Sequence, residues 1–295
     1  DLGFHRDGVR TFQISLPFTR YGGPDSWIRF YDDLRRRLAQ LPGVETAAVG
    51  SDLPMAGDLS MEPYLPGELA GSHSWGSRTA LHRSVSPGYF EATGIRLLEG
   101  RSFRDHDRAG SPAVAVIDEE IARQLRLDRA GPVLGRRLDV TRHVFSDGYS
   151  VERTEVEVVG IVATVPHDHP EATPAGMIYL PHAQYPLWSM VVLLQGSEER
   201  LPEAAAARAL IADIDPTLPI FSVRSLADVV AEKLAATRFL LALIATLAAV
   251  VAVLVGTGLF GMMAETVRHG RRDLGVGRPP PPPRAPRGGG GGGGG

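Results

Sequence analysis

The chain of 295 residues contains no cysteine and a single lysine, Lys233. The lack of cysteine excludes a disulfide-stapled secreted module, a thiolate zinc site, an iron–sulfur protein and a cysteine nucleophile. The only lysine does not stand in a GxxxxGK[ST] motif, the loop that cradles nucleotide phosphates. We therefore expect that this chain cannot hydrolyse ATP by itself.

Positive charge is concentrated in one short segment. From Glu265 onward six arginines stand against two acidic residues, although the whole chain has a net charge of −3. The residues before Glu265 are therefore acidic overall. Basic residues confined to a tail are not the pattern of a nucleic-acid-binding protein, and we expect no nucleic-acid partner.

Charge is missing altogether from residues 239–264, a run of 26 residues. A helix of this length measures about 39 Å, against roughly 30 Å for the hydrocarbon core of a bilayer. Buried helices of soluble proteins are much shorter on average. We therefore predict a transmembrane helix, with the lipid bilayer as a partner, rather than a core helix of a large soluble protein.

The flanks of this run predict its orientation. One arginine precedes it and several follow it, namely Arg238 on one side and Arg268, Arg271, Arg272 and Arg278 on the other. Basic residues beside a span are retained in the cytoplasm. We expect a protein of the cell inner membrane, with residues 1–237 outside the cytoplasm and the C-terminus inside.

Both ends of the sequence are unusual for a membrane protein. The chain begins at Asp1 without a signal peptide or an earlier apolar run, and proline and glycine runs follow Gly277. Such runs cannot pack a core. We expect residues 265–295 to form a basic, disordered cytoplasmic tail, and the sequence to be a piece of a larger membrane protein whose preceding anchor is missing.

A β-α-β pattern opens the outer region. Residues 9–16 and 44–50 are β-rich, and Pro42-Gly43 ends a helix predicted between them over residues 24–41. Apolar side chains recur in this helix at spacings of three and four, which indicates one buried face: Trp27, Phe30, Tyr31, Leu34 and Leu38. We expect the consecutive arginines of the same helix to face water: Arg35, Arg36 and Arg37.

A matching pattern closes the outer region. Strands predicted over residues 188–194 and 219–223 flank a helix over residues 201–214 and a turn at Asp215-Pro216. Two such units can interleave into a split β-α-β sandwich of ferredoxin-like type. The predicted fold class is therefore α+β. An extracytoplasmic, porter-like split β-α-β subdomain would comprise residues 1–54 and 187–224.

The residues between these units predict a second, inserted subdomain, mainly β, over residues 55–186. Its signals are three short strands and one helix: residues 113–117, 155–162 and 177–180, and residues 119–125. Beyond the second unit, residues 225–238 predict a connecting helix. It continues into the membrane helix with neither proline nor glycine between Leu226 and Val255, so a rigid lever is expected.

Motifs spread over nearly all of residues 1–276 resemble a known family. They are Gly3-Phe4 with Asp7, residues 30–49 (FYDDLRRRLAQLPGVETAAV), Leu53-Pro54, residues 85–107 (VSPGYFEATGIRLLEGRSFRDHD), residues 113–123 (AVAVIDEEIAR), residues 158–162 (VVGIV), residues 178–184 (IYLPHAQ) and residues 258–276. On these stretches the chain resembles the MacB-like periplasmic core domain followed by an FtsX-like permease helix, found in type VII ABC transporters. It is similar in particular to acidobacterial permeases that carry the module twice.

The resemblance implies a permease subunit. Its outer domain would change shape when a cytoplasmic ABC ATPase opens and closes, for export or for mechanotransmission in the envelope. The implied partners are that ATPase and a periplasmic adaptor or a second permease copy. The chain is expected to be no enzyme, without catalytic residues, cofactor or metal. It departs from the family at Gly277, where the family continues into a cytoplasmic coupling segment.

The stretch over residues 85–107 also has a physical interpretation of its own. A turn at residues 86–88 precedes two large apolar anchors, Tyr89 and Phe90. Gly94 and Gly100 permit backbone angles that are closed to other residues. Further on, Arg101 can reach one of two carboxylates for a bidentate pair, that of Asp105 or that of Asp107. A structural scaffold is favoured over a contact with a ligand or partner.

Two motifs suggest ligands but are better explained otherwise. Residues 256–261 match the GxGxxG dinucleotide fingerprint, which needs a strand before it. Here it lies inside the uncharged run, where Gly258 and Gly261 predict a helix-packing face. His167-Asp168-His169 could share a zinc ion on a strand. The prolines on both sides favour an exposed loop over such a site.

The acidic pairs and the serines do not indicate catalysis. Glu119 and Glu120, or Asp105 and Asp107, could do acid–base work only with a raised pKa in a cleft. Both glutamates stand at the start of a predicted helix, where carboxylates favour the helix dipole. The serines lack a GxSxG motif.

Two other functions remain open. The sensor region of a single-pass receptor could have the same sandwich-plus-helix plan and bind a small ligand. It predicts a cytoplasmic effector after the span, whereas a permease predicts further apolar runs of about 20 residues. An anchored envelope enzyme is the third interpretation, and it lacks a convergent nucleophile, base and oxyanion donors.

Overall fold

The computed structural model describes residues 7–54, 61–66, 78–144, 150–165, 176–197, 199–202, 204–218, 220–229, 231 and 242–256. Its strands are β1 (Val9–Ser15), β2 (Thr46–Gly50), β3 (Met61–Pro66), β4 (Thr79–Val85), β5 (Leu97–Gly100), β6 (Val114–Asp118), β7 (Arg137–Val144), β8 (Ser150–Val162), β9 (Met177–Pro181), β10 (Ser189–Gln195) and β11 (Ile220–Ser225). Its helices are α1 (Pro24–Leu38), α2 (Tyr89–Thr93), α3 (Glu119–Asp128) and α4 (Ala204–Ile214). Another helix covers residues 242–256.

The first and last β-α-β units interleave in one sheet. Strands lie in the order β11-β1-β10-β2, and each neighbouring pair is antiparallel. This is the strand order of a ferredoxin-like split β-α-β sandwich, so the predicted α+β class is confirmed. We call β1, α1, β2, β10, α4 and β11 the split unit. Helix α1 ends at Leu38 rather than at Leu41, and α4 begins at Ala204 rather than at Leu201.

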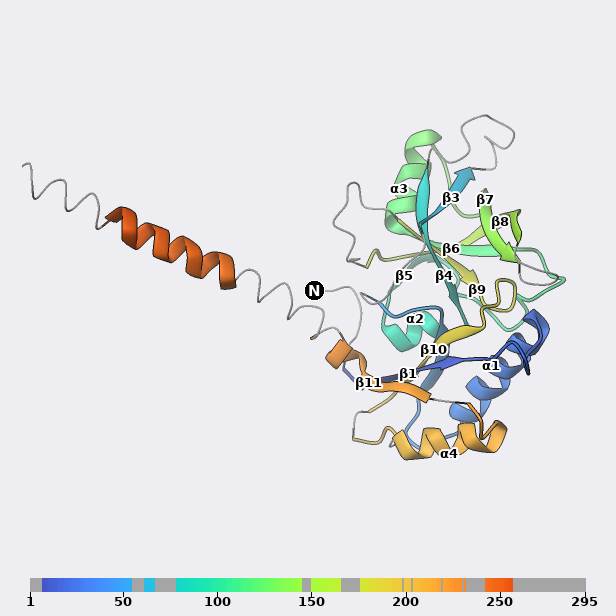
Figure 1. The fold of residues 1–295 in the computed structure, drawn as a ribbon. Coiled ribbons are helices and arrows are strands. Elements are labelled where there is room, and N and C mark those ends of the chain that lie inside the picture. Colours follow the sequence, from blue (N-terminus) through green and yellow to red (C-terminus); the bar gives the residue numbers. More distant parts are fainter. Residues whose placement is uncertain are drawn as a thin grey trace, which may run out of the picture. The chain divides into compact units, whose positions relative to one another are not determined.

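Helices α1 and α4 pack on one face of this sheet, as Figure 1 shows. The five apolar side chains predicted for the buried face of α1 are all buried. They meet alternate side chains of the strands: in β2, Ala47 and Val49 belong to this core, whereas Ala48 belongs to the core on the opposite face. The spacing of three and four along α1 therefore identified its contact face correctly.

One of the three arginines of α1 does not face water. The side chain of Arg35 is only 17% exposed, and its guanidinium lies 2.7 Å from the Asp105 carboxylate. Arg36 and Arg37 are exposed, as predicted. The prediction was wrong for Arg35 because the loop after β5 covers this end of the helix, which the periodicity of α1 alone cannot indicate.

Six of the other strands pair in a closed cycle, which we call the strand ring, and β5 pairs with β8 beside it. It runs β4-β3-β7-β8-β6-β9 and returns to β4 through a parallel pairing. The predicted strands over residues 113–117, 155–162 and 177–180 correspond to β6, β8 and β9. The sequence did not predict β3, β4, β5, β7 or α2. A single residue pair, Gly50 with Val85, connects β2 of the split unit to β4 of the ring.

Two further apolar cores complete this part of the molecule. One packs α3 against the ring through Ile121, Ala122 and Leu125. The other, which we call the middle cluster, contains side chains of both sheet regions, among them Leu193 of the split unit and Tyr179 of the ring. Helix α2 lies between the two regions in Figure 1 and contributes Tyr89 and Phe90 to the middle cluster. The split unit and the ring therefore share one core.

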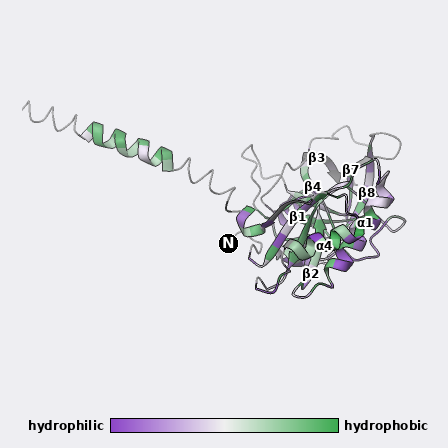
Figure 2. Cartoon of the chain, turned by 60° about the horizontal axis from the view of Figure 1, so that its bottom comes forward, coloured by the Kyte–Doolittle hydropathy of each residue, from purple (hydrophilic) through white to green (hydrophobic). Residues whose placement is uncertain are grey.

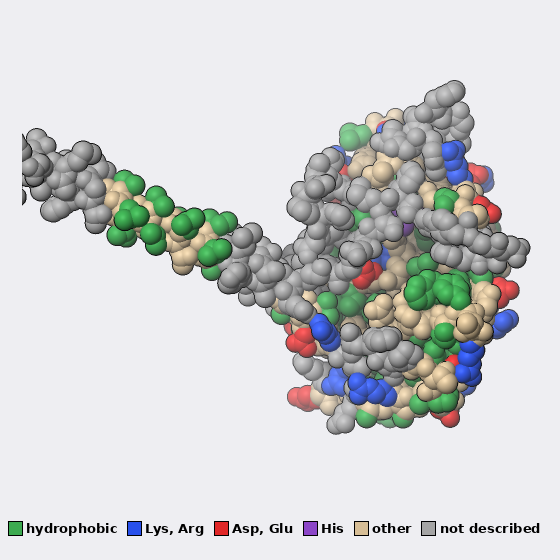
Figure 3. All heavy atoms as spheres, in the orientation of Figure 1, with side chains coloured by type: hydrophobic (Ala, Val, Ile, Leu, Met, Phe, Trp, Pro, Cys, Tyr) green, Lys and Arg blue, Asp and Glu red, His purple; other side chains and the backbone are tan. Residues whose placement is uncertain are grey.

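The chain divides into two compact units, residues 1–235 and 236–295. In the second unit the helix over residues 242–256 is apolar in Figure 2 and shows no charged side chain in Figure 3. Among the described residues, no helix combines the length and apolar character needed to cross a membrane. The predicted span over residues 239–264 reaches beyond the described helix at both ends, so it stays a prediction.

Candidate functional site at the junction of the split unit and the strand ring

The motif over residues 85–107 folds where the split unit meets the strand ring. It contains α2, which begins after Gly88 (φ 85°) and ends at Gly94 (φ 68°), both in the left-handed region that favours glycine. Two hydrogen bonds join the start of this motif to β2: the Ser86 N–H donates to the Val49 carbonyl (2.8 Å), and the Val49 N–H donates to the Ser86 hydroxyl (2.9 Å). The turn predicted there therefore attaches α2 to the split unit.

The aromatic side chains of α2 are the anchors that the sequence predicted. Tyr89 and Phe90 are buried in the middle cluster. The ring of Phe90 lies 5.0 Å from that of Tyr179 in β9 and 6.1 Å from that of Phe103, measured between centroids. Such aromatic pairs stabilise a core beyond the area that they bury. Helix α2 is therefore held on both sides of the junction.

Arg101 forms a bidentate pair with Asp107, one of the two predicted partners. Its two terminal nitrogens lie 2.7 and 2.9 Å from the two carboxylate oxygens, and the Arg104 N–H donates a third bond of 2.8 Å. Burial by itself would raise the pKa of Asp107, but the bonds from Arg101 and Arg104 outweigh it and hold this pKa below its usual range. The pair closes the loop that follows β5.

Asp105, the other predicted partner, contacts the split unit instead. Its carboxylate accepts a 2.7 Å bond from Arg35 of α1. Nearby, His182 Nε2 lies 2.9 Å from Asp32 Oδ1, also of α1, and His182 is almost fully buried. Burial favours a raised pKa for Asp32, yet the bond to His182 and nearby arginine charges lower it. Two polar contacts therefore join α1 to loops that follow strands outside the split unit.

A buried guanidinium completes the junction. Arg83 of β4 is 1% exposed, and it donates to the Tyr89 hydroxyl (3.0 Å) and to the Leu53 carbonyl (2.9 Å). The Tyr89 hydroxyl in turn donates to the Asp52 carbonyl (3.1 Å). A charge in such a place is costly unless it is hydrogen-bonded. Arg83 thus holds the ring, α2 and the loop after β2 in one network.

Comparison with known families identifies this arrangement. The family model of the MacB-like periplasmic core domain matches residues 6–211, which include the split unit up to α4, the ring and the junction. The chain belongs to this family. Because the match covers most of the chain, it confirms the part of the resemblance that concerns the outer domain. The FtsX-like helix and the acidobacterial type stay predictions.

Two solved structures are similar to this MacB-like domain. The periplasmic region of MacB from Actinobacillus actinomycetemcomitans is 14% identical, with 79% of this chain and 94% of that chain covered and a TM-score of 0.44. The extracellular domain of YknZ, a noncanonic ABC-type transporter of Gram-positive bacteria, is also 14% identical, with 72% and 100% covered and a TM-score of 0.42. No curated protein gives a significant match.

The acidic residues at the start of α3 have structural contacts in the MacB-like domain. Glu120 pairs with Arg123 one turn later, at 2.6 Å. The preceding Asp118, which the sequence analysis did not single out, caps the helix by accepting from the Ile121 N–H (2.9 Å). Burial raises the pKa of Asp118 to about 6, although hydrogen bonds to the carboxylate oppose this shift. These contacts are those of a helix start.

The two ligand motifs weighed in the sequence analysis fall largely outside the described residues. His167-Asp168-His169 lies there, as do residues 257–261 of the glycine motif. Among the residues that are described, no cluster of three or more histidine or acidic side chains could hold a metal ion. At the junction, hydrogen bonds and ion pairs connect the split unit, α2 and the loops that follow strands outside the split unit.

The sequence analysis missed Arg83 and His182. Arg83 stands in a β-rich stretch and His182 directly follows one. A charged or polar residue at such a place is ordinarily assigned to the exposed face. Their burial depends on partners far away in the sequence, Leu53 for Arg83 and Asp32 for His182. No spacing within the chain indicates such pairs.

Proposed function

We propose that the chain is part of a permease subunit of an ABC-type transporter, MacB-like in its outer domain and FtsX-like in its membrane helix. In this proposal the outer domain changes shape in response to a cytoplasmic ABC ATPase. The membership of residues 6–211 in the MacB-like family supports the proposal. So does the order of the sequence, in which the domain precedes an uncharged run with arginines beyond it. We further propose that the permease is of the acidobacterial type, which carries the module twice.

The observation that carries the mechanism is the burial of Leu226. This residue directly follows β11, at the start of the proposed connecting helix, and it is fully buried in the middle cluster together with Tyr89 and Tyr179. Val229, one turn later, packs against the same cluster. A displacement of the connecting helix would therefore act directly on the core that the split unit and the ring share.

Strand β11 offers a second route for the same displacement. It pairs with β1 in antiparallel register, with Arg10 opposite Ser225, and the Thr11 hydroxyl donates to the Arg224 carbonyl (3.2 Å). Strand β1 is in turn paired with β10 along its whole length. Sheets and packed helices transmit motion as rigid bodies. We therefore propose that residues 1–54 and 187–224 move as one subdomain against residues 55–186.

The proposed location is the inner membrane, with residues 1–237 outside the cytoplasm and the C-terminus inside. The proposed partners are the lipid bilayer, a cytoplasmic ABC ATPase and either a periplasmic adaptor or a second permease copy. Mechanotransmission and export are alternative uses of the same motion. Both require that a helix crosses the bilayer between the ATPase and the outer domain.

The orientation can be tested by cysteine labelling, since the chain has no cysteine of its own. We suggest two single variants of the full-length protein, Asp213→Cys on α4 and His269→Cys in the tail. A membrane-impermeant maleimide should label the first in intact spheroplasts and the second only after permeabilisation. Labelling of the tail in intact spheroplasts, with the α4 cysteine protected, would contradict the proposal.

The coupling can be tested at the junction. Arg35→Cys places a thiol at the contact between α1 and Asp105. Inside-out vesicles from the host hold the outer domain in their lumen, so a membrane-permeant maleimide is used. ATP should change the rate at which it labels Arg35→Cys, whereas the rate at the exposed Asp213→Cys should stay constant. Insertion of a Gly-Pro pair after Ala236 should abolish the ATP effect. An ATP effect that survives this insertion, or none in the parent, would overturn the proposed lever.

A further inference from the structure

Two charged side chains at the start of α1 differ from the others on the same helix. The others all have partners: Asp32 with His182, Asp33 with Arg36 and Arg37, and Arg35 with Asp105. Asp25 and Arg29, in contrast, are exposed and have no partner among the described residues. An acid four residues before an arginine ordinarily pairs with it on an exposed helix. Here one turn of α1 presents an unpaired acid beside an unpaired cation.

A hollow of about 180 Å³ lies beside this turn of α1. It is lined by four residues of α1 and by three residues outside the split unit, namely Asp25, Ile28, Arg29 and Asp32, and Arg108, Ala109 and Ala183. The turn before α1 adds room, because a Cβ added at Gly22 or Gly23 would meet no atom within 4 Å. A second backbone can therefore approach the start of α1 closely.

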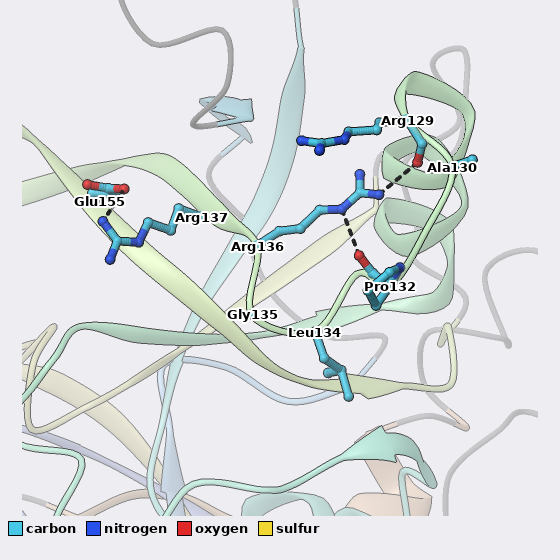
Figure 4. Close-up of a pocket in the computed structure, with 8 residues that line it drawn as sticks. All are labelled: Arg129, Ala130, Pro132, Leu134, Gly135, Arg136, Arg137 and Glu155. Atoms are coloured by element: carbon cyan, nitrogen blue, oxygen red, sulfur yellow. Dashed lines mark hydrogen bonds and ion pairs between the residues drawn. The ribbon is translucent and has the colours of Figure 1, made fainter.

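The arginines that line the larger hollow beside the end of α3, of about 540 Å³, are already engaged. In Figure 4 Arg137 is turned toward Glu155, from which it lies 3.2 Å away. Arg136 donates to the carbonyls of Arg129 (2.7 Å) and Pro132 (2.9 Å), and Arg129 has a partner of its own. These charges act within the domain, whereas those of Asp25 and Arg29 are available to a partner from outside.

An acid and a cation one turn apart on an exposed helix form a self-complementary pattern. When two such helices meet antiparallel across a two-fold axis, each acid lies opposite the cation of the other copy. We propose that the start of α1 is the contact surface with a second copy of this chain, in which Asp25 of each copy pairs with Arg29 of the other. The hollow beside α1 provides space for the arginine side chain that enters. This inference rests on the proposed function for the second permease copy and adds the surface that the two copies share.

The helix dipole explains only part of this pattern. Asp25 belongs to the first turn of α1, where a carboxylate favours the dipole. The dipole gives no reason for the free Arg29 one turn later. Exposed ion pairs add little affinity, but they fix the orientation of a contact and exclude wrong partners. Two copies anchored in one membrane need little affinity, because their confinement raises the effective concentration.

Charge reversal tests the contact in the full-length protein, with dimerisation measured by sedimentation equilibrium in a neutral detergent. Asp25→Arg and Arg29→Asp each place like charges opposite each other and should weaken the dimer about tenfold. The double variant with both reversals restores opposite charges and should return to within about twofold of the parent. Arg200→Asp is the matched control, because it reverses an exposed arginine beside Gly43, past the far end of α1.

A disulfide trap tests the same contact in the membrane, since the chain has no cysteine of its own. Two differently tagged copies, one with Asp25→Cys and one with Arg29→Cys, should cross-link under mild oxidation, whereas Asp25→Cys with Arg200→Cys should not. The proposal is overturned if the folded double reversal dimerises no better than the single ones, or if the two cysteine pairs cross-link equally. The labelling of Asp213→Cys and His269→Cys reports the membrane orientation separately, so a failure of the proposed function is distinguishable from a failure of this contact.

Discussion

The two faces of the sheet in the split unit are built differently. The face toward α1 and α4 is covered by apolar and aromatic side chains, with Trp27 and Leu34 fully buried at its centre. The face toward the ring combines an apolar cluster with a buried arginine, Arg83. The loops beyond it contribute further polar links, those of Asp107 and His182. One sheet thus separates a core of apolar and aromatic side chains from a core that also contains a buried arginine.

The difference indicates what each face does. An apolar core is stabilised by non-directional burial and tolerates little rearrangement, because any gap forfeits contacts. Hydrogen bonds and ion pairs are directional, and one set can be exchanged for another at small net cost. The helix face of the sheet therefore gives the split unit its stability. In the proposed mechanism the junction face is the joint, and its hydrogen bonds and ion pairs are exchanged between two positions.

The largest expected effect comes from the helix face. Trp27→Ala removes a fully buried indole together with its hydrogen bond to the Tyr21 carbonyl. The free energy of unfolding should fall by about 4 kcal/mol. Urea titration of the full chain, followed by circular dichroism at constant detergent, measures it. A loss below about 1 kcal/mol would show that the helix face is not the main source of stability.

A pH titration tests a polar group that is buried in the ring, Asp118. Its pKa is raised to about 6 by burial, so the folded state favours the protonated form. The contribution of Asp118 to the free energy of unfolding should therefore be largest below pH 4. Roughly 3 kcal/mol of this contribution should be lost as the pH rises through 6. Asp118→Asn should remove this decline while keeping a helix cap. A decline that persists in the variant would assign it to another group.

A substitution at the junction should lower the free energy of unfolding less than a substitution in the core under α1 and α4. Asp107→Asn removes one charge of the bidentate pair and leaves Arg101 without its carboxylate. We expect a loss of about 2 kcal/mol in the free energy of unfolding. Because the pKa of Asp107 is lowered, its stabilisation should be present above pH 4 and disappear as the pH falls further. If Asp107→Asn lowers the free energy of unfolding as much as Trp27→Ala does, the junction contributes as much to stability as the core under α1 and α4.

The smallest effect is expected on the exposed side of α1. Arg37 forms exposed ion pairs with Asp33 (2.8 Å) and Asp213 (3.3 Å). Arg37→Gln should change the free energy of unfolding by less than about 0.5 kcal/mol, because solvent and salt screen such pairs. The same urea titration serves as the measurement. A larger loss would mean that the contact between α1 and α4 depends on charge.

Parts of this fold follow from local pattern. The apolar spacing in α1, the β-rich runs beside it and the later matching unit predicted the split β-α-β arrangement, since each pattern is contained within one element. The ring was predicted only in part. Strand β7 begins with alternating polar and apolar residues, a strand signal that the sequence analysis missed, whereas α2 has only five residues, too few for a helical period to be recognised.

The junction could be predicted only where partners are close in sequence. Arg101 and Asp107 are six residues apart, and the pair was foreseen with Asp105 as its alternative. The choice between the two acids depends on Arg35, which α1 brings to Asp105 from a distant part of the chain. The same holds for Asp32 with His182. Contacts of this kind come from tertiary packing, and local periodicity contains no information about them.

The central claim is that the split unit and the ring move against each other when the ATPase works. Spin labels at Asp213→Cys on α4 and Leu127→Cys on α3 occupy exposed positions in the two regions. Pulsed electron paramagnetic resonance on the full-length protein in inside-out host vesicles would measure the distance between them. The account predicts that the distance distribution shifts when ATP is added and returns when it is exhausted. One unchanged distribution in both conditions would contradict it.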